Sequence, residues 1–185
     1  FRTLDKQYTF SSASDEQSAD IKSDNKIIHG DNLEALKALL PEYEGRIKCI
    51  YIDPPYNTGN ENWVYNDNVN SPKIQKWLGQ VVGKEAEDLS RHDKWLCMMY
   101  PRLSLLRQLL SDDGAIFISI DDNEQANLKL ICDEIFGAGN LVANLIWSNK
   151  EGGGSSDSKL FRIKNEHILC YAKIIDDIVI KGVQI

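Results

Sequence analysis

The sequence lacks the glycine-rich loops that most often bind phosphate groups. Neither the G-x-G-x-x-G pattern of dinucleotide-binding folds nor the G-x-x-x-x-G-K pattern of P-loop proteins occurs in its 185 residues. The one glycine cluster, at residues 152–154, lies among charged and serine residues and does not open an apolar helix, as a phosphate-binding turn does. We interpret this cluster as a mobile loop.

Long apolar runs are missing as well. No stretch approaches the ~18 apolar residues that a membrane-spanning helix requires, so we expect no membrane contact. The composition, with 42% hydrophobic and 26% charged residues, is ordinary for a packed domain. These features indicate a globular, cytoplasmic protein.

Cysteine and histidine are too few and too scattered to predict a metal site. They share no short metal-ligand or redox spacing, and each cysteine lies inside an apolar stretch. We therefore expect buried, reduced thiols and no metal. The residues concerned are Cys49, Cys97, Cys132 and Cys170, with His29, His92 and His167.

Positive charge is scarce, because 21 Lys and Arg residues face 28 Asp and Glu residues and the net charge is −7. Contacts with phosphates drive non-specific affinity for DNA, so this chain is not expected to hold DNA by itself. The balance reverses locally at Lys159, Arg162 and Lys164, beside Phe161. This patch suits either a contact with nucleic acid or an ordinary solvated loop.

Residues 50–59, Ile-Tyr-Ile-Asp-Pro-Pro-Tyr-Asn-Thr-Gly, carry the most chemical information. An apolar strand leads into Asp53, Pro54, Pro55 and Tyr56. The prolines fix φ near −65° and carry no N–H, so the neighbouring carbonyls face the site without a competing donor. The Asp53 carboxylate and a backbone carbonyl then form a pair of acceptors that matches the two hydrogens of an exocyclic amine. The Tyr56 ring can stack on the base that carries this amine.

This arrangement favours the transfer of an electrophilic group to the amine of a nucleobase. The lone pair of such an amine is delocalised into the ring, and accepting both hydrogens favours the pyramidal, nucleophilic form. A strand-terminating turn is the bland alternative, since Asp, Pro and Gly are usual turn residues. The following Asn57, Thr58 and Gly59, and the matched surroundings below, favour the functional interpretation.

Four blocks of the chain together resemble the amino methyltransferases of DNA that use S-adenosylmethionine. The resemblance is strongest to the β-class enzymes and to the Mod subunits of Type III restriction–modification systems, and it spans residues 26–173. The blocks are residues 29–36, residues 51–59, residues 95–103 with 112–124, and residues 165–173.

The resemblance implies a bacterial, cytoplasmic enzyme that methylates adenine N6 in duplex DNA. The adenine is rotated out of the duplex and stacks on Tyr56, and its amino hydrogens bond to Asp53 and to the carbonyl of Pro54. The methyl group then moves by direct in-line displacement. Catalytic roles follow for Asp53, Pro54, Pro55 and Tyr56, and a cofactor-binding role near adenosine for Asp31. By residue chemistry alone, Asp31 is equally well explained as a helix cap.

The resemblance also implies partners, and it leaves alternatives open. A Mod homodimer is expected, with a restriction (Res) subunit as a further partner. Methylation of cytosine at N4 is the nearest alternative, although Asp at the first motif position favours adenine. A catalytically silent DNA-binding or assembly module, and a small-molecule or protein methyltransferase, are the others.

One family motif is absent from the chain. The Phe-x-Gly-x-Gly strand and turn that holds the methionine part of the cofactor lies, in the β class, beyond a target-recognition segment C-terminal to the catalytic loop. We therefore expect residues 26–185 to be the catalytic-loop part of a longer methyltransferase domain, preceded by an arm at residues 1–25. Such a fragment is expected to be inactive alone, with a gap of two strands in its sheet.

The hydrophobic pattern predicts an incomplete Rossmann-like α/β sheet of the S-adenosylmethionine-dependent methyltransferase type, with helices on both faces. Asp31, Asp53 and Asp121 are expected at the carboxyl ends of strands, where ligands bind in such sheets, and Asp121 is better explained as a helix cap. Strands are predicted at residues 26–29, 47–52 (covered on both faces), 115–120, 141–148 and 167–172. Helices are predicted from residue 31 to Pro41 or Gly45, from 90 or 92 to 110 with a kink at Pro101, and over 123–136. Residues 57–88 are predicted to form an active-site lid.

Overall fold

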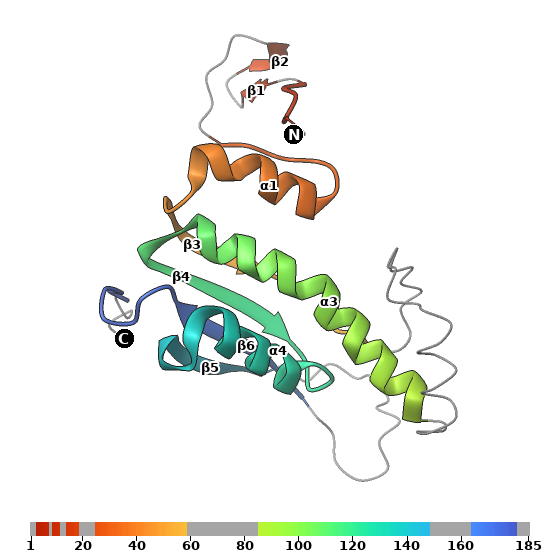
Figure 1. Cartoon of the computed structure of the whole chain (residues 1–185). Helices are drawn as coiled ribbons and strands as arrows, with labels where there is room; N and C mark the ends of the chain where they lie inside the picture. Colours follow the sequence, from red (N-terminus) through yellow and green to blue (C-terminus); the bar gives the residue numbers. More distant parts are fainter. Residues whose placement is uncertain are drawn as a thin grey trace.

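The computed structural model describes residues 3–7, 9–11, 14–18, 25–58, 85–148 and 164–180. Its main feature is a four-stranded sheet in the order β3-β4-β6-β5 (Figure 1). β3 (Ile47–Ile52) runs parallel to β4 (Leu110–Ile120), whereas β6 (Asn165–Ala172) runs antiparallel to both β4 and β5 (Leu141–Ser148). The predicted α/β class is confirmed.

The helices build a second layer beside this sheet. α3 (Glu85–Leu109) lies along β4, and α4 (Gln125–Cys132) lies against β6 (Figure 1). α4 continues as a π-helical turn (Asp133–Gly137) and a 3-10 turn (Ala138–Asn140). α1 (Asn32–Tyr43) packs on α3, and its Leu36 reaches the core.

The core lies between the sheet and α3 and α4. Alternate residues of β4 point into it, as the period of two in a strand requires, and residues of both helices meet them. Burial of each large side chain contributes roughly 1.5–3 kcal/mol, so this layer carries most of the packing energy. Its main members are Trp95, Met99, Leu103, Ile116, Ile118, Ile120, Leu128, Phe136, Leu169 and Tyr171. Met99 is therefore a core residue, as its helical spacing predicts.

β3 is less covered than its apolar sequence predicts. Ile50 and Ile52 pack against the core, but Tyr51 is 61% exposed and Cys49 is exposed too. The prediction that both faces of this strand are covered is wrong within the described residues, because Ile50 and Ile52 face the core whereas Cys49 and Tyr51 point to the opposite, exposed face. β3 is also the last strand in the order of the sheet. The predicted gap of two strands lay next to β3, and in the described structure this side of β3 has no neighbouring strand.

The cysteines divide into two pairs. All four are free; Cys132 and Cys170 are buried as expected, whereas Cys49 and Cys97 are exposed. Burial raises the pKa of Cys132 to about 12 and that of Cys170 to about 11, so these two thiols stay protonated at neutral pH.

The predicted strand at residues 26–29 does not form. Ile27 is fully exposed, and Lys26 instead donates to the carboxylate of Glu42 at 3.0 Å and lies over the ring of Tyr43, both at the end of α1. This segment therefore lies beside the end of α1 and not in the sheet. α1 itself passes through Pro41 and ends at Tyr43.

Other boundaries differ at the ends of the elements. β4 starts at Leu110, five residues earlier than predicted, because its register against β3 shifts between Ile47 and Cys49. α4 begins at Gln125, two residues later than predicted. β1 (Thr9–Ser11) and β2 (Ser14–Ser18) form a small antiparallel sheet within the predicted arm. The lid beyond Thr58, the glycine cluster, Lys159, Phe161 and Arg162 lie outside the described residues.

Candidate active site

The Asp53–Tyr56 segment leaves β3 at the carboxyl end of the strand. β4 ends beside it at Ile120, and the antiparallel β6 begins there, because Ile120 pairs with His167. Residues from three strands therefore meet at one edge of the sheet, which is where ligands bind in open α/β sheets.

The Tyr56 side chain is held by two acidic groups. Its hydroxyl donates a hydrogen bond to Oε2 of Glu166 on β6 at 3.1 Å. Burial, the Asp53 carboxylate and the Glu166 carboxylate together raise the pKa of Tyr56 well above its usual value. The hydroxyl thus remains a donor, and its bond fixes the orientation of the ring while Asp53 is exposed to solvent.

The backbone of the same segment is fixed from α3. Nε1 of Trp95, a fully buried side chain, donates to the carbonyl of Pro55 at 2.7 Å. The packed core holds the indole ring in one position, so its hydrogen bond restrains the backbone of Pro54 and Pro55.

Asn57 follows Tyr56 in the left-handed region, with φ of 58°. Asn tolerates this conformation better than most residues. Its carbonyl accepts from Nη1 of Arg91 at 2.6 Å, and its side-chain amide donates to Oε1 of Glu124 and to the carbonyl of Arg91. The chain reversal after Tyr56 is therefore held from both sides.

Glu124 is the centre of this anchoring. The residue is 0% exposed, and its carboxylate also contacts Nδ1 of His92 at 2.6 Å and accepts from Nδ2 of Asn127 at 2.8 Å. A buried carboxylate is stable only when it is paired and hydrogen-bonded. Glu124 thus links α3 and α4 to Asn57, the residue directly after the Asp53–Tyr56 segment.

The other predicted site residues take structural positions. Asp31 caps α1 by accepting from the backbone N–H of Glu34 at 3.0 Å, and a role in cofactor binding stays a prediction. Asp121 accepts from the backbone N–H of Asn123 at 2.9 Å, a local turn, whereas the N-cap of α4 is Glu124. The helix-cap interpretation of Asp121 is therefore wrong in detail: it stabilises the turn before the helix.

The sequence interpretation assigned no role to five residues that hold this loop, namely Arg91, His92, Trp95, Glu124 and Glu166. Each makes a contact over 30 or more positions, which no local pattern reveals. The only signal was that several lie in the blocks that resemble the methyltransferases.

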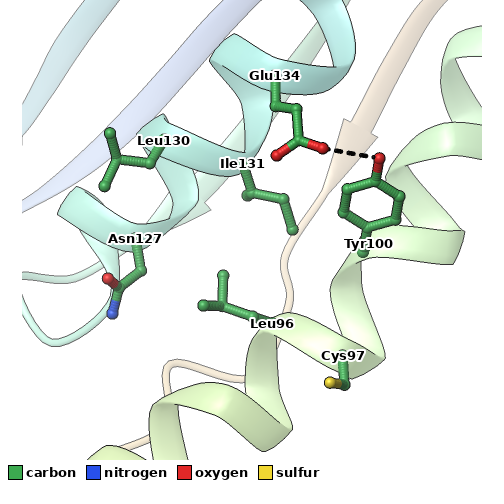
Figure 2. A pocket seen from close by; sticks show the side chains of 7 residues that line it. All are labelled: Leu96, Cys97, Tyr100, Asn127, Leu130, Ile131 and Glu134. Atoms are coloured by element: carbon green, nitrogen blue, oxygen red, sulfur yellow. Dashed lines mark hydrogen bonds between the residues drawn. The ribbon is translucent and has the colours of Figure 1, made fainter.

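A pocket apart from the Asp53–Tyr56 segment lies between α3 and α4 (Figure 2). This cavity of about 370 Å³ is lined mainly by apolar side chains, and Tyr100 closes one side by donating to Oε1 of Glu134 at 3.0 Å. Asn127 lines it as well and also binds Glu124, so the pocket borders the anchoring cluster. Among the described residues no group of His, Cys, Asp and Glu is suited to hold a metal ion, and no helix is long and apolar enough to cross a membrane.

Two relatives share the sequence over most of the chain. The Mod subunit of the Type III restriction-modification enzyme EcoP15I of Escherichia coli is 40% identical over 169 residues, which cover 85% of this chain and 26% of that protein. The Mod subunit of the StyLTI enzyme of Salmonella typhimurium is 46% identical over 160 residues, which cover 82% of this chain and 24% of that protein. The chain thus spans about a quarter of the length of these relatives.

A solved structure shares the fold. The cytosine-N4-specific PvuII DNA methyltransferase has a TM-score of 0.51 and 15% identity, and the match covers 80% of this chain and 49% of that one. Residues 47–176, from the start of β3 to beyond the end of β6, match the family described as DNA methylase. Because this match covers most of the chain, the chain belongs to the DNA methylase family.

Proposed function

We propose that the protein containing this chain methylates the N6 amino group of adenine at a specific DNA sequence, with S-adenosylmethionine as the methyl donor. One observation carries the proposal. The exposed carboxylate of Asp53 lies beside a Tyr56 ring whose hydroxyl is fixed by Glu166, at the carboxyl end of the sheet. An exposed acceptor next to a held aromatic ring suits a flipped base that carries an amino group.

Each residue of the loop has a distinct task in this proposal. The Tyr56 ring stacks on the flipped adenine, and its hydroxyl bond keeps the ring in one plane. Asp53 and the Pro54 carbonyl accept the two amino hydrogens and turn the nitrogen lone pair towards the methyl group. Pro55 positions these groups, because its carbonyl is tied to Trp95. Such positioning is a large source of rate enhancement in two-substrate reactions.

When bound, S-adenosylmethionine would supply an electrophilic methyl group, and Asp53 and the Pro54 carbonyl would hold the amine that forms the C–N bond as the C–S bond breaks and then releases a proton. Asp31 is the residue of this chain proposed to contact the adenosine part. Its Oδ1 caps α1, and a carboxylate has further acceptor sites that suit a hydroxyl donor.

The partners follow from what the relatives are. They are Mod subunits of Type III restriction-modification enzymes, so we propose duplex DNA as substrate, a Mod homodimer and a restriction subunit as further partner. The net charge of −7 indicates that basic DNA-contacting residues lie mainly outside this chain.

The test uses the full-length protein, a DNA library and S-adenosylmethionine, with nucleosides analysed by mass spectrometry. N6-methyladenine is expected, and Asp53→Ala should reduce its formation at least about 1,000-fold while the melting temperature stays the same, because Asp53 is exposed. N4-methylcytosine would favour the alternative base. Unmodified DNA, bound but not methylated by the unaltered protein, would support the silent module instead.

A further inference from the structure

We infer that Glu124 is a positioning residue for methyl transfer, which acts through Asn57 to hold the Asp53–Tyr56 segment in its productive geometry. This inference rests on the proposed function. It concerns a residue outside the Asp-Pro-Pro-Tyr motif, on a different element, and it assigns a purpose to the most deeply buried acidic group of the described structure.

Glu124 is buried at an energetic cost that its hydrogen-bond partners offset. A carboxylate removed from water costs several kcal/mol unless donors surround it, and here donors from two helices and the loop converge on it. Oε1 faces the Asn57 amide and Nδ1 of His92, whereas Oε2 faces the Asn127 amide. The amide nitrogens of Asn57 and Asn127 donate to this carboxylate, and Nδ1 of His92 lies within hydrogen-bonding distance of it.

Asn57 occupies the position in the chain from which Glu124 can control the loop. It is the residue directly after Tyr56, it is 6% exposed, and its φ of 58° reverses the backbone. Glu124 holds its side chain and Arg91 holds its carbonyl. When the side-chain bond is lost, the reversal relaxes and Tyr56 shifts with it.

A second carboxylate on the outer side of the same helix pair differs from Glu124 in its burial. Glu134 also links the α4 region to α3, through Tyr100, but it is exposed and lies at the pocket shown in Figure 2. The Glu134–Tyr100 bond shows that a carboxylate can join the two helices at an exposed position, without the cost of burial. Glu124, in contrast, is fully buried and bonds to the loop residue Asn57.

The experiment uses the full-length protein and compares Glu124→Ala, Glu124→Gln, Asn57→Ala and the double variant Asn57→Ala/Glu124→Ala. Glu134→Gln is the matched control. Single-turnover methyl transfer should fall about 100-fold in Glu124→Ala, since a shift of about 1 Å at a reacting centre costs that much. Glu124→Gln keeps one acceptor oxygen and should fall about 10-fold. Glu134→Gln should stay within about twofold.

The double variant distinguishes positioning from general support of the fold. If Glu124 acts through Asn57, the two single losses are not additive and the double variant is no slower than the slower single one. Additive losses would overturn the inference. DNA affinity should change by less than about threefold in all variants, so that the loss appears in the rate and not in binding.

A second readout does not depend on activity. Hydrogen–deuterium exchange of the peptide covering residues 50–58 should quicken in Glu124→Gln and not in Glu134→Gln, at temperatures where both proteins remain folded. Unchanged exchange together with an unchanged rate would refute the inference. If the unaltered protein methylates no DNA, the proposed function fails, whereas the exchange measurement still decides whether Glu124 holds the loop.

Discussion

The two ends of the β3–β4 pair are built on different principles. At the carboxyl end, side chains from α3, α4 and β6 converge on a loop whose own acid, Asp53, is exposed. At the amino end, the contacts serve the backbone itself: Arg46 N–H donates to Leu109, and the Lys173 side chain donates to the carbonyl of Leu110 at 2.7 Å. The contacts at the carboxyl end therefore hold the Asp53–Tyr56 loop, whereas the contacts at the amino end connect the backbone of neighbouring elements.

This division predicts that substitutions at the two ends separate activity from stability. Changes at the amino end should alter the free energy of unfolding and leave the methyl-transfer rate of the folded protein intact. Changes at the carboxyl end should lower the methyl-transfer rate by more than their effect on the free energy of unfolding explains.

The largest effect is expected at Gly114, at the amino end. A Cβ there would lie 2.8 Å from the carbonyl oxygen of Ile47 and 2.9 Å from that of Ser111, both backbone atoms. Gly114→Ala should therefore destabilise the fold by about 1–3 kcal/mol, since the backbone must shift. Urea unfolding measures this. Gly139→Ala is the control, because a Cβ there meets nothing within 4 Å; equal effects in both variants would show that Gly114 is not sterically required.

The next effect belongs to Trp95, at the carboxyl end. Trp95→Phe keeps most of the buried ring but removes the bond to the Pro55 carbonyl. A single hydrogen bond contributes about 1 kcal/mol, and loss of the fixed loop should lower single-turnover methylation by about 10-fold. Stability should fall by the value of that bond and by the packing lost around the smaller ring, because Trp95 is fully buried. An unchanged rate would mean that the prolines hold their conformation unaided.

A pH effect on stability is expected from Tyr56. Its pKa is raised in the folded state, by burial first and by Asp53 and Glu166 next. The unfolded chain loses this proton near pH 10, so the folded state binds more protons above that pH and stability falls as pH rises past it. Below pH 10 the contribution is fully present.

Urea midpoints at pH 8 and pH 11 measure this effect. Tyr56→Phe removes the titrating group, so its midpoint should fall less between the two pH values than that of the unaltered protein. Burial and Asp133 also raise the pKa of Tyr171 in the core, so Tyr171→Phe should behave similarly. Equal falls in the Tyr56→Phe variant and the unaltered protein would contradict a raised pKa of Tyr56 in the folded state.

The sequence predicted the loop well because its constraints are local. The prolines and the apolar run before Asp53 are neighbours in the sequence, so their effect on the backbone can be predicted locally. The predicted strand at residues 47–52 has the observed bounds of β3, Ile47–Ile52. The cover of β3 was not predictable in this way. An apolar strand looks the same whether its second face meets a neighbour or remains open, as it does at Tyr51.

The support of the loop was not predictable for a different reason. Glu124 follows a run of polar residues before an apolar helix, which is typical of an exposed turn. Its carboxylate is instead buried against Asn57, which is 67 positions away in the chain, and against His92 and Asn127 on the two helices. Pairing over such distances depends on the folded topology and leaves no periodic signal.

The smallest effect is expected at Lys48, whose ion pair with Asp113 lies at the amino end. The two side chains are 68% and 46% exposed, and Lys48 and Ser111 hold the pKa of Asp113 below its usual value. Exposed ion pairs contribute little, because water and salt screen them and two long side chains must be ordered. Lys48→Met should therefore leave both the free energy of unfolding and the methylation rate nearly unchanged. A slower methyl transfer in this variant would show that the two ends of the strand pair are coupled, so the small effect is the strictest test of their independence.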